Sequence, residues 1–235
     1  MNASRTQVPH NQQNTTQILP LENGDRLSQV EFERRYTAMP KVKKAELIEG
    51  VVYMASPVRH KSHGKPHAVI MTWLSAYWMA TPGVELSDNA TVRLDPDNEP
   101  QPDALLRIES GGQSFISDDD YIEGAPELIV EIAASSASYD LYDKKRVYRR
   151  NGVQEYIVWQ TFENKLDWFI LQAGEYVLLQ PDNNGVVRSL VFPGLWLDIA
   201  ALLAGDIAKV ITVLQLGLAS PEHTQFIELL SKQQP

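Results

Sequence analysis

The sequence contains no cysteine among its 235 residues. This excludes disulfide bonds, a thiolate nucleophile and cysteine-based zinc or iron–sulfur sites, so any metal must be bound by oxygen or imidazole ligands. Long apolar runs are missing as well, since none approaches the eighteen or so residues that a membrane-spanning helix needs. The opening residues, Met1–Arg5, lack the apolar stretch of a secretory signal. We therefore expect a soluble, cytoplasmic protein.

Basic residues are fewer than acidic ones: 21 lysines and arginines against 30 aspartates and glutamates give a formal net charge of −9. This balance argues against a broad basic face that coats nucleic acid. The charge is unevenly distributed, because residues 95–127 carry most of the acidic excess while residues 41–67 and 140–150 are locally basic. Such clusters are usually solvated surface, but these two would hold a phosphate backbone if the fold brought them together.

The chain divides into three parts by composition. Residues 1–25 are polar without apolar periodicity and are predicted to form a disordered tail. Residues 26–200 are predicted to form one domain, because 43% of the chain is apolar and no linker interrupts this stretch. Residues 201–235 are predicted to form a helical C-terminal extension, whose apolar stripe favours a homodimer.

Hydrophobic periodicity predicts an α/β fold with a mixed β-sheet flanked by helices. Residues 128–134 form an almost continuous apolar run, typical of a strand buried on both faces, and a helix over 140–150 follows it. A helix is also predicted from Ser62, on a stripe formed by Val69, Ile70, Trp73, Leu74, Tyr77 and Trp78. Strands are predicted within 46–54, turning near Gly50, and at 84–88, 90–95, 103–108, 153–159, 166–171 and 176–179.

Two acidic residues stand out in this pattern. Glu131 lies inside the apolar run, where an ionised carboxylate is costly unless a cation or hydrogen bonds compensate it. It is therefore either a metal ligand or a structural acid. Asp103 follows a Pro-Gln-Pro approach to a strand and is either a turn residue or an acid pointing into a cleft. Two carboxylates from neighbouring strands are the hard ligands that Mg²⁺ prefers. Glu127, at the entrance of the apolar run, is expected to be solvated.

Lys144 lies on the helix after this strand, four residues after Asp140. The spacing suits an ordinary surface ion pair, but a lysine here can also lean over the sheet end toward Asp103 and Glu131. Both interpretations stay open. His63 and His67 have the spacing of a helical zinc pair, yet the glutamate of an H-E-x-x-H motif is missing, so a zinc site is the weaker interpretation.

Several short motifs occur in a definite order: Glu46-Leu47-Ile48-Glu49-Gly50, His63-Gly64, Pro102-Asp103, Pro126–Ile132, Asp140-x-x-x-Lys144-x-x-x-Tyr148 and Gly152–Tyr156. This order, over residues 28–200, resembles the Uma2 family of restriction endonucleases, a branch of the PD-(D/E)XK nuclease superfamily. The resemblance implies a restriction-endonuclease-like sheet and Mg²⁺-dependent hydrolysis of phosphodiester bonds, with Mn²⁺ as an alternative metal.

The resemblance also implies site residues. Asp103 corresponds to the first acid of the superfamily motif and Glu131 to the second, so both are expected to bind the metal and to act in catalysis. Ala133 stands where the superfamily pattern has its lysine. Similar family members place a lysine on the next helix, which here corresponds to Lys144. Either Glu46 or Glu49 would serve as an auxiliary ligand.

Two functions follow from these observations. The first is an endonuclease that hydrolyses phosphodiester bonds in nucleic acid, with DNA as the expected substrate. The second is a catalytically weakened binding or assembly module on the same fold, which the acidic balance and Ala133 favour. A glycosidase with paired carboxylates is a distant third, because nothing in the sequence fixes the separation of two acids.

Overall fold

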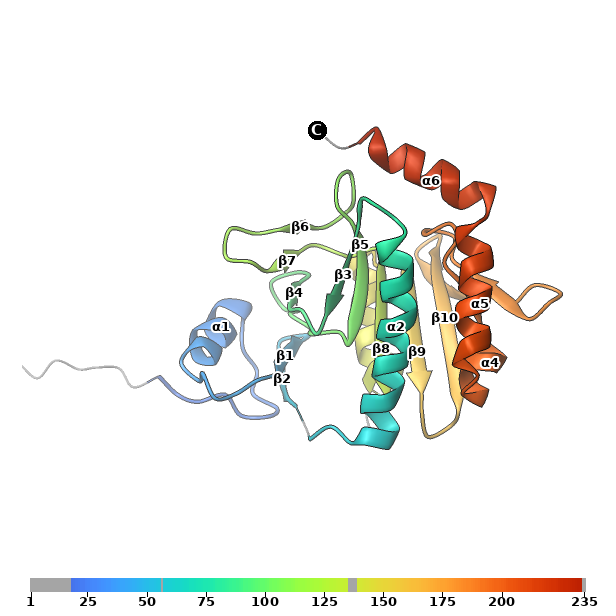
Figure 1. Ribbon diagram of the computed structural model, residues 1–235. Helices are drawn as coiled ribbons and strands as arrows, with labels where there is room; N and C mark the ends of the chain where they lie inside the picture. The colour runs from blue at the N-terminus through green and yellow to red at the C-terminus, as the bar shows by residue number, and fades with distance from the viewer. Residues whose placement is uncertain (1–17, 56, 135–138, 234–235) are drawn as a thin grey trace, which may run out of the picture.

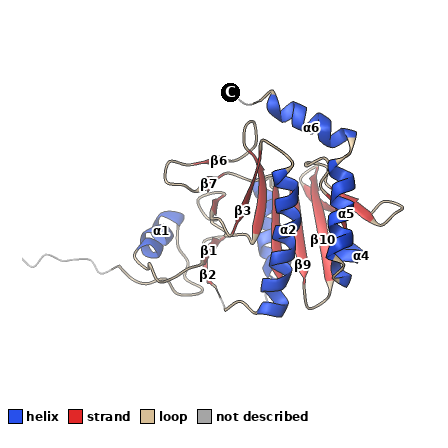
Figure 2. Ribbon diagram, viewed as in Figure 1, coloured by secondary structure: helices blue, strands red, loops and turns tan. Residues whose placement is uncertain are grey.

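The computed structural model describes residues 18–55, 57–134 and 139–233. Its centre is a six-stranded sheet in the order β11–β10–β9–β8–β5–β3 (Figures 1 and 2). Within this sheet β8 and β9 run parallel, and the other neighbours run antiparallel. The predicted mixed α/β sheet is confirmed. Its strands are β3 (Val84–Asp88), β5 (Ala104–Ile108), β8 (Leu128–Ala133), β9 (Glu155–Gln160), β10 (Lys165–Gln172) and β11 (Glu175–Leu178).

Strand β8 is buried along its whole length, as its apolar sequence predicts. Successive side chains of a strand point to opposite faces, so Leu128, Val130 and Ile132 enter one core and Ile129 and Ala133 enter the other. Glu131 lies between Ile129 and Ala133 in this alternation and therefore points to the second face.

Helix α2 (Lys65–Met79) covers the first face, preceded by the short π-helix η1 (His60–Gly64). Ile70, Trp73, Leu74 and Tyr77 are buried as predicted. Trp78 is 44% exposed, because successive helical residues are rotated by about 100° and Trp78 turns away from the sheet.

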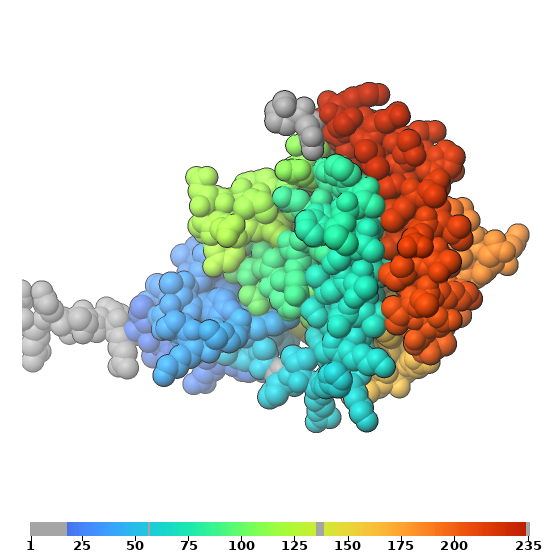
Figure 3. Space-filling view, viewed as in Figure 1, coloured from blue at the N-terminus to red at the C-terminus, as the bar shows by residue number. Residues whose placement is uncertain are grey.

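The C-terminal helices pack beside α2 on the same face, as the space-filling view shows (Figure 3). They are α4 (Ile199–Ala204), α5 (Ile207–Leu218) and α6 (Pro221–Ser231). Leu202, Val210 and Phe226 join the core of the sheet, so residues 201–233 share the core of the domain. Leu216 and Leu229 remain exposed on α5 and α6. A homodimer through these helices stays a prediction.

The second face is covered by π-helix η2 (Tyr139–Lys144) and α3 (Lys145–Asn151), which form the crossover between β8 and β9. Together they match the helix predicted over residues 140–150. Gly152 ends α3 with φ +83°, a left-handed conformation that glycine adopts without strain. Among the described residues, no helix is both long and apolar enough to cross a membrane.

The N-terminal part, at the left in Figure 1, contains α1 (Gln29–Thr37) and the hairpin of β1 (Ala45–Ile48) and β2 (Val51–Met54). Leu21 is buried in a small core with Phe32 and Leu47. The packed part of the chain thus begins before residue 26, within the stretch that composition predicts as a tail. Residues 1–17 of that tail lie outside the described residues.

Two small sheets complete the fold. One contains β4 (Val92–Arg93), β7 (Ile122–Glu123) and β6 (Phe115–Ile116), and the other pairs β12 (Val186–Arg188) with β13 (Trp196–Asp198). The first of these lies beside the N-terminal part of the protein (Figure 2).

Glu155, at the start of β9, ties the segment after β12 to the central sheet. One carboxylate oxygen accepts hydrogen bonds from the backbone amides of Leu190 (2.7 Å) and Val191 (3.2 Å). The other accepts from Ser189 Oγ (2.8 Å) and Trp168 Nε1 (3.1 Å). The buried carboxylate thus faces four donors.

We expect Glu155→Gln to lower the free energy of unfolding by about 2 kcal/mol, because the new amide group would point a donor at donors and leave buried groups unpaired. Urea unfolding measures the change. Glu109→Gln, at an exposed position, is the matched control and should change the stability by less than about 0.5 kcal/mol. Equal stabilities of the two variants would contradict the anchoring role of Glu155.

Candidate active site

Asp103 and Glu131 face each other across two neighbouring strands. In the antiparallel pairing of β5 and β8, Ala104 lies opposite Val130, and extending this register by one residue places Asp103 opposite Glu131. Side chains opposite each other on one face have Cβ atoms about 5 Å apart. The backbone amide of Ile132 also donates to Asp103 Oδ2 at 2.7 Å. The structure therefore brings both predicted acids together at one end of the sheet.

Lys144 reaches the same place from the crossover. Its Nζ lies 2.9 Å from Glu131 Oε1 and 2.8 Å from Glu46 Oε1, whereas Asp140 Oδ1 is 3.8 Å away. Lys144 therefore extends over the end of the sheet toward Glu131, as the second of its two interpretations expects. Tyr148, one turn further along, donates its hydroxyl to Glu131 Oε1 at 2.8 Å.

The two upstream glutamates lie in different places. Glu46, on β1, is buried and accepts a hydrogen bond from the backbone amide of Gln101 at 2.8 Å, in addition to its ion pair with Lys144. Glu49 lies at the hairpin turn and forms ion pairs with Arg146 and Arg150. Glu46 is therefore the upstream acid that joins the cluster of Asp103, Glu131 and Lys144.

His63 and His67 both contact Asp103. His63 Nε2 lies 3.2 Å from Asp103 Oδ1, and His67 Nε2 lies 3.0 Å from the backbone oxygen of Asp103 and 3.1 Å from Asp88 Oδ1. Within the described ranges, no group of three or more histidine or acidic side chains is arranged to hold a metal ion. The contact of His63 with the acid was not predicted, although the His63-Gly64 pair in the motif order was a signal for it.

The two acids differ in their electrostatic surroundings. Burial tends to raise the pKa of Asp103, but His63, Lys44 and the Ile132 amide bring this pKa below its ordinary value. At Glu131, burial dominates and raises the pKa, although the ammonium of Lys144 opposes the shift. Asp103 is thus the more strongly anionic of the pair.

Lys144 keeps its charge in spite of its burial. Loss of solvent alone would lower its pKa, but the carboxylates of Glu131, Glu46 and Asp140 together raise it well above the ordinary value. The cluster therefore holds one buried cation among several acids.

These side chains line a cavity of about 890 Å³. Lys44 and Arg59 lie on its wall together with Tyr139, whose ring packs against Tyr53 at a centroid distance of 4.2 Å. Tyr139 Oη is buried and has no hydrogen-bond partner among the described residues. A buried polar atom without a partner is costly.

Two comparisons with known proteins are informative. Residues 30–200 match the model of the Uma2 family, described as "Putative restriction endonuclease". Among solved structures, the chain is similar to the subject of "Crystal structure of a putative nuclease belonging to DUF820 from Anabaena variabilis ATCC 29413". The identity is 14%, the match covers 77% of this chain and 97% of the other, and the TM-score is 0.51.

At this identity, the structural likeness shows a shared fold. No curated protein is similar enough to this chain to count as a match. The family model, however, covers well over half of the chain. The motif order is thereby explained, and the chain belongs to the Uma2 family.

Proposed function

We propose that the protein is a metal-dependent endonuclease that hydrolyses phosphodiester bonds in DNA. The observation that carries this proposal is the pair of buried acids, Asp103 and Glu131, opposite each other on neighbouring strands and next to Lys144 in one cavity. The description of the Uma2 family and the fold shared with the DUF820 protein from Anabaena variabilis, titled a "putative nuclease", support it.

The donor set fits a hard divalent cation, because it consists of carboxylate oxygens and Mg²⁺ is commonly held by one or two carboxylates, waters and a substrate phosphate. Asp103 and Glu131 would hold Mg²⁺ or Mn²⁺. Such a cation, when bound, lowers the pKa of a water molecule and polarises the phosphoryl oxygens.

The neighbouring residues have separate tasks in this proposal. His63 and the Ile132 amide orient the Asp103 carboxylate, and Tyr148 orients Glu131 by donating its hydroxyl. Lys144 supplies a fixed positive charge that stabilises the negative charge developing on the phosphate.

The two basic stretches contribute unequally. Within 140–150, Arg146 and Arg150 are paired with Glu49, and Lys144 is buried. Lys44 and Arg59, from the stretch 41–67, line the cavity and would contact the DNA backbone. We therefore propose that residues 41–67, and not residues 140–150, contact the phosphate backbone.

The proposal predicts a specific metal site. Purified protein should cleave DNA in Mg²⁺ or Mn²⁺ and stop in EDTA, and calorimetric titration with Mg²⁺ should show binding that Glu131→Gln abolishes or weakens at least about tenfold. Cleavage that persists in EDTA, or identical titrations of the two proteins, would exclude the assigned metal site.

A binding or assembly module is the second candidate, and the position of Lys144 favours it. The ammonium already compensates Glu46 and Glu131 at 2.8 and 2.9 Å, so these acids are satisfied without a metal. DNA binding without cleavage or metal binding would identify this alternative.

A further inference from the structure

We infer that the turn between β9 and β10 forms a platform on which an unpaired base of single-stranded DNA stacks, with Phe162 as the stacking residue. The inference rests on the proposed function and specifies the form of its substrate. It is argued from the exposure of Phe162, the attachment of the turn and the charges around it.

Phe162 is an exposed aromatic side chain on the wall of the cavity. It is 60% exposed and yet lines the same cavity as Asp103 and Glu131. Among the described residues, it makes no ring contact with another aromatic side chain. Single exposed apolar side chains are common on protein surfaces, so what sets Phe162 apart is its place on the wall of the cavity that holds the two acids.

The turn that carries Phe162 is fixed to the site. The backbone amide of Thr161 donates to the carbonyl of Ala133, two residues after Glu131, at 2.9 Å. The Thr161 hydroxyl donates to the carbonyl of Ser62 in η1 at 2.7 Å. Phe162 is therefore held at a defined position relative to both Glu131 and the basic segment around η1.

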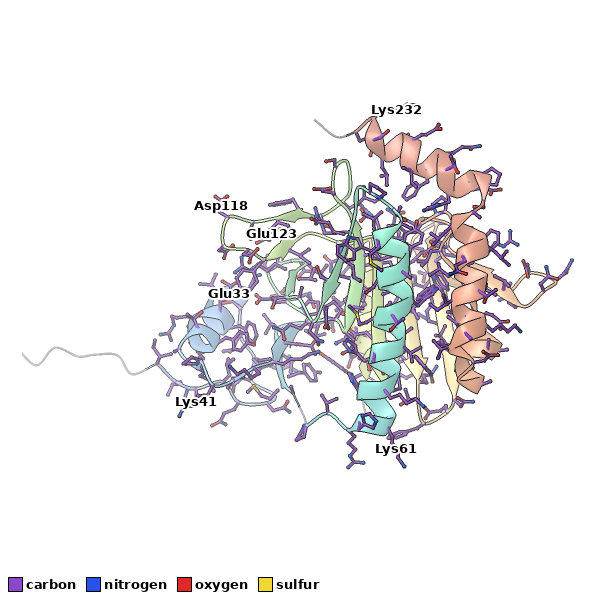
Figure 4. All side chains as sticks on the ribbon, viewed as in Figure 1. Glu33, Lys41, Lys61, Asp118, Glu123 and Lys232 are labelled. Atoms are coloured by element: carbon purple, nitrogen blue, oxygen red, sulfur yellow. The ribbon has the colours of Figure 1, made fainter. Side chains whose placement is uncertain are left out.

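The charges on that segment complement a phosphate backbone. Arg59 lines the cavity, and Lys61 projects from the end of the molecule where α2 begins (Figure 4). Within the described parts of the chain, neither side chain forms an ion pair with an acid. Free cations next to an exposed aromatic ring are the combination with which proteins bind single-stranded nucleic acid.

This combination selects unpaired bases. In a duplex, each base is covered on both faces by its neighbours, so a protein ring reaches a base face only after unstacking, which costs a few kcal/mol. An unpaired base offers its face at no such cost. The phosphates would then lie toward Arg59 and Lys61 while the base covers Phe162.

Fluorescence anisotropy with a labelled oligothymidylate and with a duplex of equal length tests the inference, with Ca²⁺ in place of Mg²⁺ to prevent turnover. Phe162→Ala should weaken binding of the single strand by about fivefold or more, the equivalent of about 1 kcal/mol. Duplex binding should change by less than about twofold. Phe162→Trp should retain wild-type binding of the single strand, because tryptophan preserves the stacking surface.

Phe115→Ala is the matched control, because Phe115 is 62% exposed on β6 and does not line this cavity. It should leave both affinities unchanged. Equal weakening of single strand and duplex by Phe162→Ala, or no weakening of the single strand, would overturn the stacking platform and leave the proposed nuclease intact. Wild-type protein that binds neither DNA would overturn both.

Discussion

The Asp103→Asn variant is expected to cleave DNA at least about 10³-fold more slowly than the wild type in Mg²⁺, a loss of about 4 kcal/mol of transition-state stabilisation. Asparagine keeps the size of the side chain and an oxygen that accepts from the Ile132 amide, so the fold should be retained. It removes the negative charge that the structure places opposite Glu131. Initial cleavage rates of the two proteins under identical conditions measure the effect.

Asp118→Asn provides the control for this experiment. Asp118 is an exposed acid on the loop between β6 and β7, at the outer edge of the molecule (Figure 4). Its replacement changes the net charge equally and should leave the rate within about twofold of wild type. If Asp103→Asn retained a wild-type rate while its melting temperature was unchanged, the cavity would not be the site of cleavage.

The Lys144→Met variant is expected to lower the free energy of unfolding by about 3–5 kcal/mol, because it removes the cation from a buried cluster of acids. Glu46 and Glu131 would then lie close together without compensation. Since whole domains are stable by about 5–15 kcal/mol, this is a large fraction of the total. Chemical denaturation followed by tryptophan fluorescence measures it.

Two further variants separate charge from packing. Lys165→Met removes a lysine whose side chain is 58% exposed and paired with Asp167, and it should cost less than about 1 kcal/mol. Adding Glu131→Gln to Lys144→Met should restore at least about 1.5 kcal/mol, because the uncompensated charge is removed. Additive effects of the two substitutions would show that Lys144 and Glu131 do not interact energetically, which contradicts the charge-compensating role of Lys144 at Glu131.

Local patterns predict much of this fold because they act over a few residues. The apolar run at 128–134 and the stripe of α2 both lead to buried elements at the predicted positions. The N-terminal boundary of the packed chain is harder to predict. Leu21 is buried in a small core with Phe32 and Leu47, and the polar composition of residues 1–25 does not reveal these contacts. The average composition of a segment does not show that one of its apolar residues is buried.

The candidate site is predictable in part, because some of its residues stand out from their local sequence. Glu131 stands out because its strand is apolar, and its neighbour across the sheet follows from strand pairing. The choice of Glu46 over Glu49 depends on where the hairpin lies relative to Lys144, nearly one hundred residues later in the chain. Only the assembled fold fixes such a contact.

Glu127 shows most clearly what local sequence cannot predict. We expected its side chain to be solvated, and this prediction is wrong. The side chain is buried and accepts hydrogen bonds from the backbone amides of Ile108 at 2.8 Å and Gln113 at 2.7 Å. Ile108 is the last residue of β5, and Gln113 lies in the loop that follows it. A carboxylate satisfied by backbone amides has no signature in the local sequence.

The parallel pairing of β8 with β9 has a consequence for how the protein folds. Two parallel neighbours cannot be joined by a tight hairpin, so the chain must make a long excursion before β9 can dock. Lys144 lies on that excursion. The counter-ion of Glu131 is therefore carried by the same segment that joins the two parallel strands. The charged cluster is therefore complete only when this crossover has packed against the sheet.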